Sequence, residues 1–129
     1  MRTTKNIERH FQNLNDIRNQ IIIVDDSSVF EFKLLDNSLL IAFASWSGPG
    51  LSNFIQTIKL IDERSYKGQI VIVDIDEITP ELQVKTFGEL CHGWAEIFLF
   101  DKGQVVERFL GASCFEKFKL KVDNLQMRI

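Results

Sequence analysis

The run from Leu39 to Ala44 is apolar at every position, and Gly48-Pro49 follows it within a few residues. A strand that is apolar on both faces is typical of the centre of a sheet that helices cover on two sides. Proline is favoured in the first turn of a helix, where its missing N–H would be unbonded in any case. Apolar residues then continue at helical spacing: Leu51, Phe54, Ile55, Ile58 and Ile61. The segment therefore predicts a buried strand that leads directly into a helix.

The same alternation of strand and helix patterns extends over the rest of the chain. Short apolar or alternating runs predict strands at 21–24, 39–44, 69–75, 97–100 and 105–110. Helical spacing or capping residues predict helices at 3–19, around Phe30 to Leu35, from Pro49, from Thr79-Pro80 through Phe87, and from Ser113. Asp101-Lys102-Gly103 predicts a tight hairpin turn between the last two strands. This order favours an α/β fold, with a central mixed β-sheet flanked by helices on both faces.

Composition excludes several classes of protein. A chain of 129 residues that is 45% hydrophobic can bury a real core in one domain without metals or disulfides. The net charge of -3 argues against a nucleic-acid partner. The longest apolar run is too short to cross a membrane, and the first residues lack the apolar core of a signal peptide. We therefore expect a soluble cytoplasmic protein with no membrane partner and no cofactor.

The two cysteines, Cys91 and Cys114, form no Cys-x-x-Cys pair and no metal-ligand spacing with His10 or His92, so no metal site is expected. A disulfide between them stays open on sequence alone, although thiols in a chain without a secretory signal are more often reduced. Cys91-His92 is a candidate pair of thiol and base. If the pair lies on a strand, the two side chains point to opposite faces and need not interact.

The stretch Trp46-Ser47-Gly48-Pro49-Gly50 resembles the Trp-Cys-Gly-Pro-Cys active-site motif of thioredoxins. Residues 73–76 resemble the end of the third strand of that family, residues 98–105 its final hairpin, and Gly111-Ala112 the turn before its last helix. The resemblance covers residues 20–127. It implies a thioredoxin-like domain at residues 20–129. Residues 1–19, which the resemblance does not cover, are predicted to form an extra amphipathic helix, because Ile7, Phe11 and Leu14 recur at helical spacing.

The resemblance also implies that the redox chemistry is lost. Ser47 and Gly50 stand where the family has its two cysteines, and without a thiolate no disulfide exchange can begin. The buried Asp of the family falls at Ile41 and its buried Lys at Ile72. Its cis-proline falls near Ala95, where a trans bond is expected because a cis bond without proline is costly. No catalytic residue is therefore predicted, and Ser47 is interpreted as a helix N-cap rather than a nucleophile.

By resemblance, Trp46 and Trp94 flank the groove in which thioredoxins hold an extended peptide. We therefore predict a peptide-binding groove formed by Trp46, Pro49, Trp94 and Ala95, since tryptophan is favoured as a binding anchor. The alternative is that one or both tryptophans belong to the core. Partial exposure is favoured for Trp46, and both readings stay open for Trp94.

The leading hypothesis for function is a redox-inactive, protein-binding module, an adaptor or chaperone-like protein, whose groove holds another protein or an extended peptide. The alternative is an atypical single-thiol oxidoreductase that uses Cys91 or Cys114. A third reading assigns the N-terminal helix to a homodimer interface, and the same apolar face could instead cover the chain's own sheet or a neighbouring helix.

Overall fold

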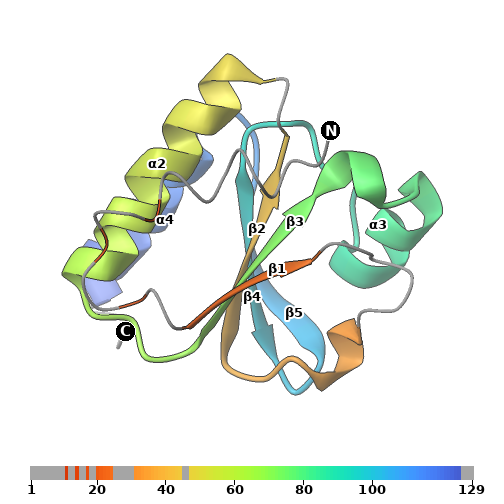
Figure 1. The fold of residues 1–129 in the computed structure, drawn as a ribbon, viewed down its shortest axis with the longest axis horizontal. Helices are drawn as coiled ribbons and strands as arrows, with labels where there is room; N and C mark the ends of the chain where they lie inside the picture. Colours follow the sequence, from red (N-terminus) through yellow and green to blue (C-terminus); the bar gives the residue numbers. More distant parts are fainter. Residues whose placement is uncertain are drawn as a thin grey trace.

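A computed structural model describes residues 11, 14, 17, 20–24, 31–44 and 47–125. The strands are β1 (Ile21–Val24), β2 (Ser38–Phe43), β3 (Gln69–Asp74), β4 (Glu96–Asp101) and β5 (Gln104–Phe109). They form one sheet in the order β1-β3-β2-β4-β5 (Figure 1). β3 pairs in parallel with β1 and β2, whereas β4 is antiparallel to both β2 and β5. The prediction of a mixed sheet is therefore confirmed.

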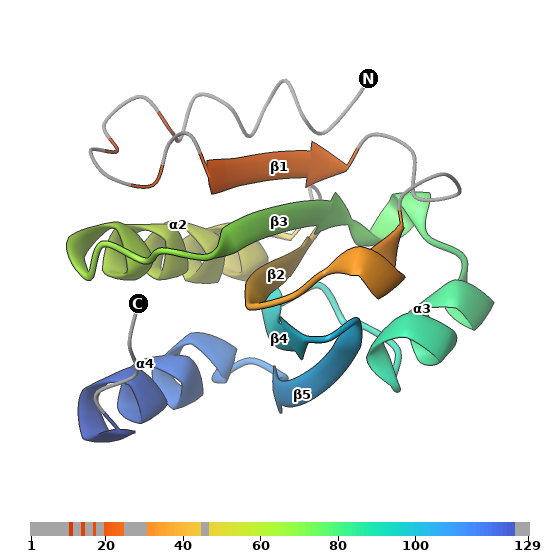
Figure 2. The same cartoon turned by 90° about the horizontal axis from the view of Figure 1, so that it is seen from below.

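Helices cover both faces of this sheet. α2 (Gly48–Glu63) and α4 (Cys114–Leu125) lie on one face, and α3 (Pro80–Phe87) lies on the other (Figures 1 and 2). Two short 3-10 turns, η3 (Phe32–Leu34) and η4 (Ile75–Glu77), connect the elements. The layered arrangement predicted from the alternation of strand and helix patterns is confirmed by these elements.

The central strands divide their side chains between two apolar clusters, because successive residues of a strand point to opposite faces. Leu39, Ile41 and Phe43 of β2 belong to the cluster that includes α2 and α4. Leu40 and Ala42 belong to the cluster that includes Phe87 of α3. A continuous apolar run is thus required at β2, since neither of its faces meets water.

Ile41 and Ile72 are register partners on β2 and β3, and both are fully buried in the α2–α4 cluster. These are the two positions at which the resemblance places a buried Asp and a buried Lys. Two isoleucines avoid the desolvation that a buried charged pair would suffer. The apolar packing expected at these positions is confirmed.

Local chemistry fixes the turns that bound the elements. The two-residue turn between β4 and β5 has positive φ at both Lys102 (53°) and Gly103 (77°), as a type I′ hairpin turn requires. β3 ends at Asp74, one residue before the predicted end, because the Asp74 carboxylate accepts from the Asp76 N–H and starts η4.

The predicted helix around Phe30 to Leu35 is a single 3-10 turn over Phe32–Leu34, and Phe30 lies outside the described residues. The predicted helix over residues 3–19 lies mostly outside them as well. At its described positions, Phe11 is in a 3-10 turn, Leu14 is in no regular element and Ile17 is in a bend, so an α-helix does not continue through them. The surrounding sequence is rich in Asn and Asp, whose side chains compete for backbone hydrogen bonds.

These three described residues nevertheless pack on the chain's own core. Phe11, Leu14 and Ile17 are buried in the α2–α4 cluster, and the rings of Phe11 and Phe54 lie 6.3 Å apart. The Ile17 N–H donates to Asp62 Oδ1 at 3.2 Å, which ties the segment to the end of α2.

Across the described ranges, no helix is long and apolar enough to cross a membrane.

Candidate functional site

Three segments meet at the N-terminal end of α2: residues 47–50, the loop 91–95 before β4, and residues 111–114 at the start of α4. We call these segments together the motif site. Asn53 joins them, because its Nδ2 donates to the Trp94 carbonyl at 2.9 Å and to the Ala112 carbonyl at 3.3 Å. Trp46, the first residue of the motif, lies outside the described residues.

Ser47 is the N-cap of α2. Its backbone is extended (φ -100°, ψ 112°), and its Oγ accepts from the Gly50 N–H at 3.0 Å. This bond satisfies one of the free N–H groups that every helix start leaves. Pro49 stands in the first turn, as predicted. The N-cap interpretation of Ser47 is confirmed, and its hydroxyl holds the helix start in place.

Gly50 is buried where backbone from the 91–95 loop approaches it closely. A Cβ atom added at Gly50 would lie 2.3 Å from the Gly93 carbonyl oxygen and 2.9 Å from Ser47 Oγ, both shorter than real Cβ contacts. Gly48 is different, since nothing lies within 4 Å of a Cβ added there. The position of the family's second cysteine therefore has no room for any side chain unless backbone moves.

The thiol of Cys114 is fully buried beneath the same loop. Its Sγ donates to the Trp94 carbonyl at 3.2 Å, and Asn53 Nδ2 lies 3.6 Å from the sulfur. Burial, reinforced by the nearby negative charge of Glu96, raises the pKa of Cys114 to about 12. The group is therefore a protonated thiol at neutral pH, and the thiolate needed for nucleophilic attack is almost absent.

Cys91 is half-buried in the loop between α3 and β4. Burial raises its pKa to about 12, with smaller contributions from the charges of Glu96 and Glu89. Both thiols are free, so the open possibility of a Cys91–Cys114 disulfide is not realised in this structure. A cysteine is activated by nearby positive charge and by access to solvent, whereas the charged neighbours of Cys91 are negative.

The Cys91-His92 pair lies in this loop and not on a strand, so the argument from opposite strand faces does not apply to it. The two backbone N–H groups are held by different side chains. The Cys91 N–H donates to Gln83 Oε1 at 2.9 Å, and the His92 N–H donates to Glu96 Oε1 at 2.6 Å. The loop is thus fixed by buried acceptors from α3 and β4 instead of by strand pairing.

Glu96 is fully buried at the start of β4, a position that sequence reasoning missed. One carboxylate oxygen accepts from His92 N–H, and the other accepts from the Gly111 N–H at 3.1 Å. Hydrogen bonds from backbone N–H groups are the means by which a buried carboxylate is satisfied. Glu96 therefore links the loop before β4 to the turn before α4.

The residues of the predicted groove, Trp46, Pro49, Trp94 and Ala95, differ in their exposure where the structure describes them. Pro49 is exposed, Trp94 is half-buried against the core, and Ala95 is fully buried. Ala95 has a φ of 61°, which is strained for a residue with a Cβ. All peptide bonds in the described ranges are trans. Ala95 thus shapes the loop from within, and the exposed surface comes from Pro49 and Trp94.

Asn53 was also missed from sequence, although a signal was available. It occupies the buried face of α2 together with Phe54, Thr57 and Ile61, and a polar residue on a buried helix face needs a partner. Glu96 gives a similar signal, because it stands at the head of the apolar run Ile97 to Phe100.

In the part of the chain that the structure describes, no three His, Cys, Asp or Glu residues gather as metal ligands do.

The fold is that of known thioredoxin structures. The thioredoxin NaTrxh from Nicotiana alata superposes with a TM-score of 0.62 at 22% identity, over 85% of this chain and 94% of that one. A chain from the structure on the thiol resolving mechanism in yeast mitochondrial 1-Cys peroxiredoxin gives 0.58 at 22% identity, over 81% and 96%. Thioredoxin Mala s 13 from Malassezia sympodialis gives 0.59 at 19% identity, over 83% and 90%.

No protein-family profile matches the sequence, and no curated protein matches it at a significant level. The structural likeness, at about one residue in five identical, establishes a thioredoxin-like fold and leaves the activity open. The predicted fold class is confirmed.

Proposed function

We propose that this chain is a redox-inactive thioredoxin-like protein that binds another protein, as an adaptor or chaperone-like module, through the surface around the motif site. The close approach of Gly50 to Gly93 carries the proposal. A dithiol site needs a second sulfur at this position, and the backbone of the neighbouring loop fills the space that its Cβ would require.

The thiols of Cys91 and Cys114 support the same proposal. Both have pKa values raised to about 12, so neither supplies a thiolate at neutral pH. The rival function, a single-thiol oxidoreductase, has one observation in its favour, the partial exposure of Cys91. Such an enzyme would need a lowered thiol pKa, and here burial and acidic neighbours raise it. Two free thiols fit the reducing environment of the cytoplasm, where we place the protein.

In the binding surface that we propose, a partner contacts side chains and not the backbone carbonyls of the loop. The Trp94 carbonyl accepts from Asn53 and Cys114, and the Ala95 carbonyl lies 3.5 Å from Cys114 Sγ, so both carbonyls are engaged inside the molecule. An extended partner segment would therefore contact the half-buried Trp94 ring and the exposed Pro49 ring. Aromatic anchors of this kind dominate binding energy at protein interfaces.

A homodimer through the N-terminal segment is the less supported proposal. Phe11, Leu14 and Ile17 are buried in the core of their own chain, which leaves these three residues no apolar surface for a second copy.

Selection from a displayed library of random peptides tests the proposal. The wild-type protein should enrich a peptide family that Trp94→Ala no longer binds. Val84→Ala is the matched control, because Val84 is a half-exposed apolar residue on α3, away from the motif site. Enriched peptides that bind Trp94→Ala as well as wild type, or that bind Val84→Ala as poorly, would contradict the proposed surface.

A further inference from the structure

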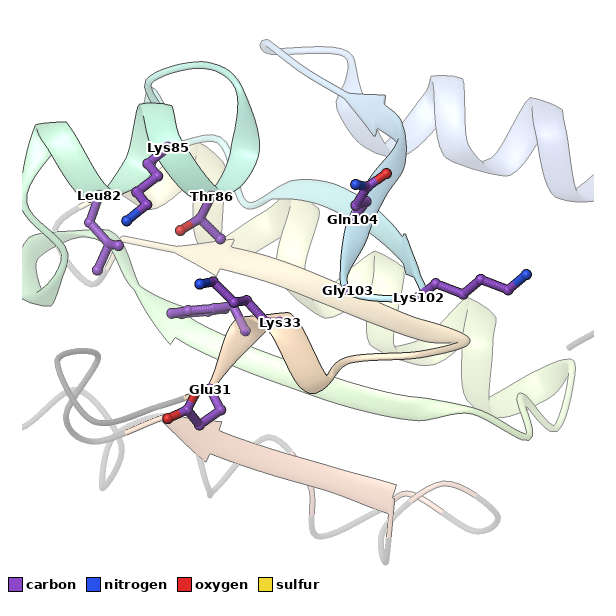
Figure 3. Close-up of a pocket in the computed structure, with 9 residues that line it drawn as sticks. Glu31, Lys33, Leu82, Lys85, Thr86, Lys102, Gly103 and Gln104 are labelled. Atoms are coloured by element: carbon purple, nitrogen blue, oxygen red, sulfur yellow. The ribbon is translucent and has the colours of Figure 1, made fainter.

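A cavity of about 490 Å³ lies between η3, α3 and the β4–β5 hairpin (Figure 3). It is on the α3 side of the sheet, whereas α2 and the motif site are on the α2–α4 side. Cavities of a few hundred Å³ are the size at which proteins bind small molecules. The cavity is therefore a second candidate site, and nothing in the proposed function uses it.

The walls of this cavity are fixed by backbone contacts. The Gly103 N–H donates to the Leu35 carbonyl at 2.6 Å, and the Lys102 N–H donates to Asp36 Oδ1 at 3.0 Å. A Cβ at Gly103 would meet the Lys33 carbonyl oxygen at 2.2 Å, so the hairpin and η3 lie backbone against backbone. The edge-to-face contact of Phe32 with Phe87, at 6.1 Å, joins η3 to α3. The cavity therefore exists before any ligand binds.

The charge of the lining is opposite to that of the whole chain. Three lysines, Lys33, Lys85 and Lys102, line the cavity against one carboxylate, Glu31, although the net charge of the protein is -3. Among the described residues, neither Lys33 nor Lys85 lies within 4.0 Å of a carboxylate oxygen. Within the part of the chain that the structure describes, no carboxylate neutralises these two ammonium groups, and the low-dielectric walls of a cleft strengthen their field.

The lining of the cavity combines charged and polar groups with apolar side chains. Figure 3 shows the ammonium groups of Lys33 and Lys85 and the hydroxyl of Thr86 turned toward the same part of the cavity, with Leu82 beside them. The Lys102 ammonium and the Glu31 carboxylate are turned away from that part. Phe32 adds an apolar surface to the lining. Two positive charges and a hydroxyl suit an anionic head, and Leu82 and Phe32 suit an apolar body.

We propose that this cavity binds a small organic anion, a compound with a phosphate or carboxylate head on an apolar body. Lys33 and Lys85 contact the head as point charges, and the Thr86 hydroxyl supplies an additional hydrogen bond that lysines alone would not. The apolar body lies against Leu82 and Phe32. Specific binding requires both parts, because the ammonium groups alone would hold any anion weakly and in a salt-dependent manner.

An NMR titration of the full chain with phenyl phosphate tests this proposal, with the backbone amides of Thr86 and Gly103 as reporters. We expect saturable shifts at both amides, tighter binding of phenyl phosphate than of inorganic phosphate, and no shift with phenol. A parallel titration with benzoate distinguishes a carboxylate head from a phosphate head. The double variant Lys33→Gln/Lys85→Gln should bind about tenfold more weakly or worse, as expected when hydrogen bonds to charged groups are lost.

Lys59→Gln is a control for the loss of positive charge elsewhere, because it removes one charge from an exposed position of α2 on the other face, where the double variant removes two from the cavity. It should leave the phenyl phosphate affinity unchanged. Absence of saturable shifts, equal weakening in Lys59→Gln, or inorganic phosphate binding as tightly as phenyl phosphate would each overturn the proposal. Since Lys33, Lys85 and Lys59 play no part in the motif site, none of these outcomes bears on the proposed binding of peptides.

Discussion

Replacement of Gly50 by Ala is the sharpest test of the packing at the motif site. The new Cβ would lie 2.3 Å from the Gly93 carbonyl oxygen, where backbone must move to relieve the overlap. Added atoms in a filled interior typically cost about 1–3 kcal/mol. Alanine also gains up to about 1 kcal/mol over glycine inside a helix, which offsets part of that cost. We therefore expect Gly50→Ala to lower the free energy of unfolding in spite of its better helix propensity.

Gly48→Ala provides the matched control for this experiment. The two glycines lie two residues apart in the same helix start, but nothing lies within 4 Å of a Cβ at Gly48. Gly48→Ala should be neutral or stabilising by about 0.4–1 kcal/mol, the gain expected when the unfolded chain loses freedom. Urea denaturation of both variants, with the midpoint and the slope fitted separately, measures the difference. Equal stability of the two variants would refute the claim that Gly93 fills the space at position 50.

Further predictions concern the thiols and the polar link beneath the loop. Since the folded chain holds the protons of Cys91 and Cys114 more tightly than the unfolded chain does, the contribution of these thiols to the free energy of unfolding should be constant below the ordinary thiol pKa of 9.0 and fall as pH rises toward about 12. Urea midpoints on both sides of pH 9.0 check this, and the fall should shrink in Cys91→Ser/Cys114→Ser. Iodoacetamide should alkylate both thiols slowly at neutral pH and faster in urea, and a fast native reaction would contradict the raised pKa values. Asn53→Ala should cost about 1–3 kcal/mol, because the carbonyls of the loop lose their donor, whereas the exposed Gln56→Ala should stay within about 0.5 kcal/mol. Equal effects in these two amides would show that the Asn53 bonds carry no stability.

The fold was predictable from sequence because its determinants are local. The apolar run from Leu39 to Ala44 and the mostly apolar run from Gln69 to Ile75 indicate strands from local sequence. Ser47 and Thr79 stand before Pro49 and Pro80, and each hydroxyl caps the helix that follows. The helix predicted over residues 3–19 lies mostly outside the described residues; at Phe11, Leu14 and Ile17 the apolar spacing reflects burial, and these three residues are not α-helical.

The interior of the motif site was not predictable, because it depends on contacts between distant residues. Nothing near Gly50 in sequence indicates that Gly93 will lie against it, and the positive φ of Ala95 follows from the packing of its loop. Glu96 is charged and yet fully buried, which no propensity would favour without the N–H groups of His92 and Gly111. Trp46, on which much of the predicted groove depends, lies outside the described residues and stays a prediction.

The reduction of insulin by dithiothreitol, followed by turbidity, tests the central claim most directly. The wild-type protein should give no rate above the dithiothreitol background, and Ser47→Cys/Gly50→Cys should give none either, because a second sulfur at position 50 does not fit against Gly93. A wild-type rate that disappears in Cys91→Ser/Cys114→Ser would contradict the claim and make this chain a single-thiol oxidoreductase.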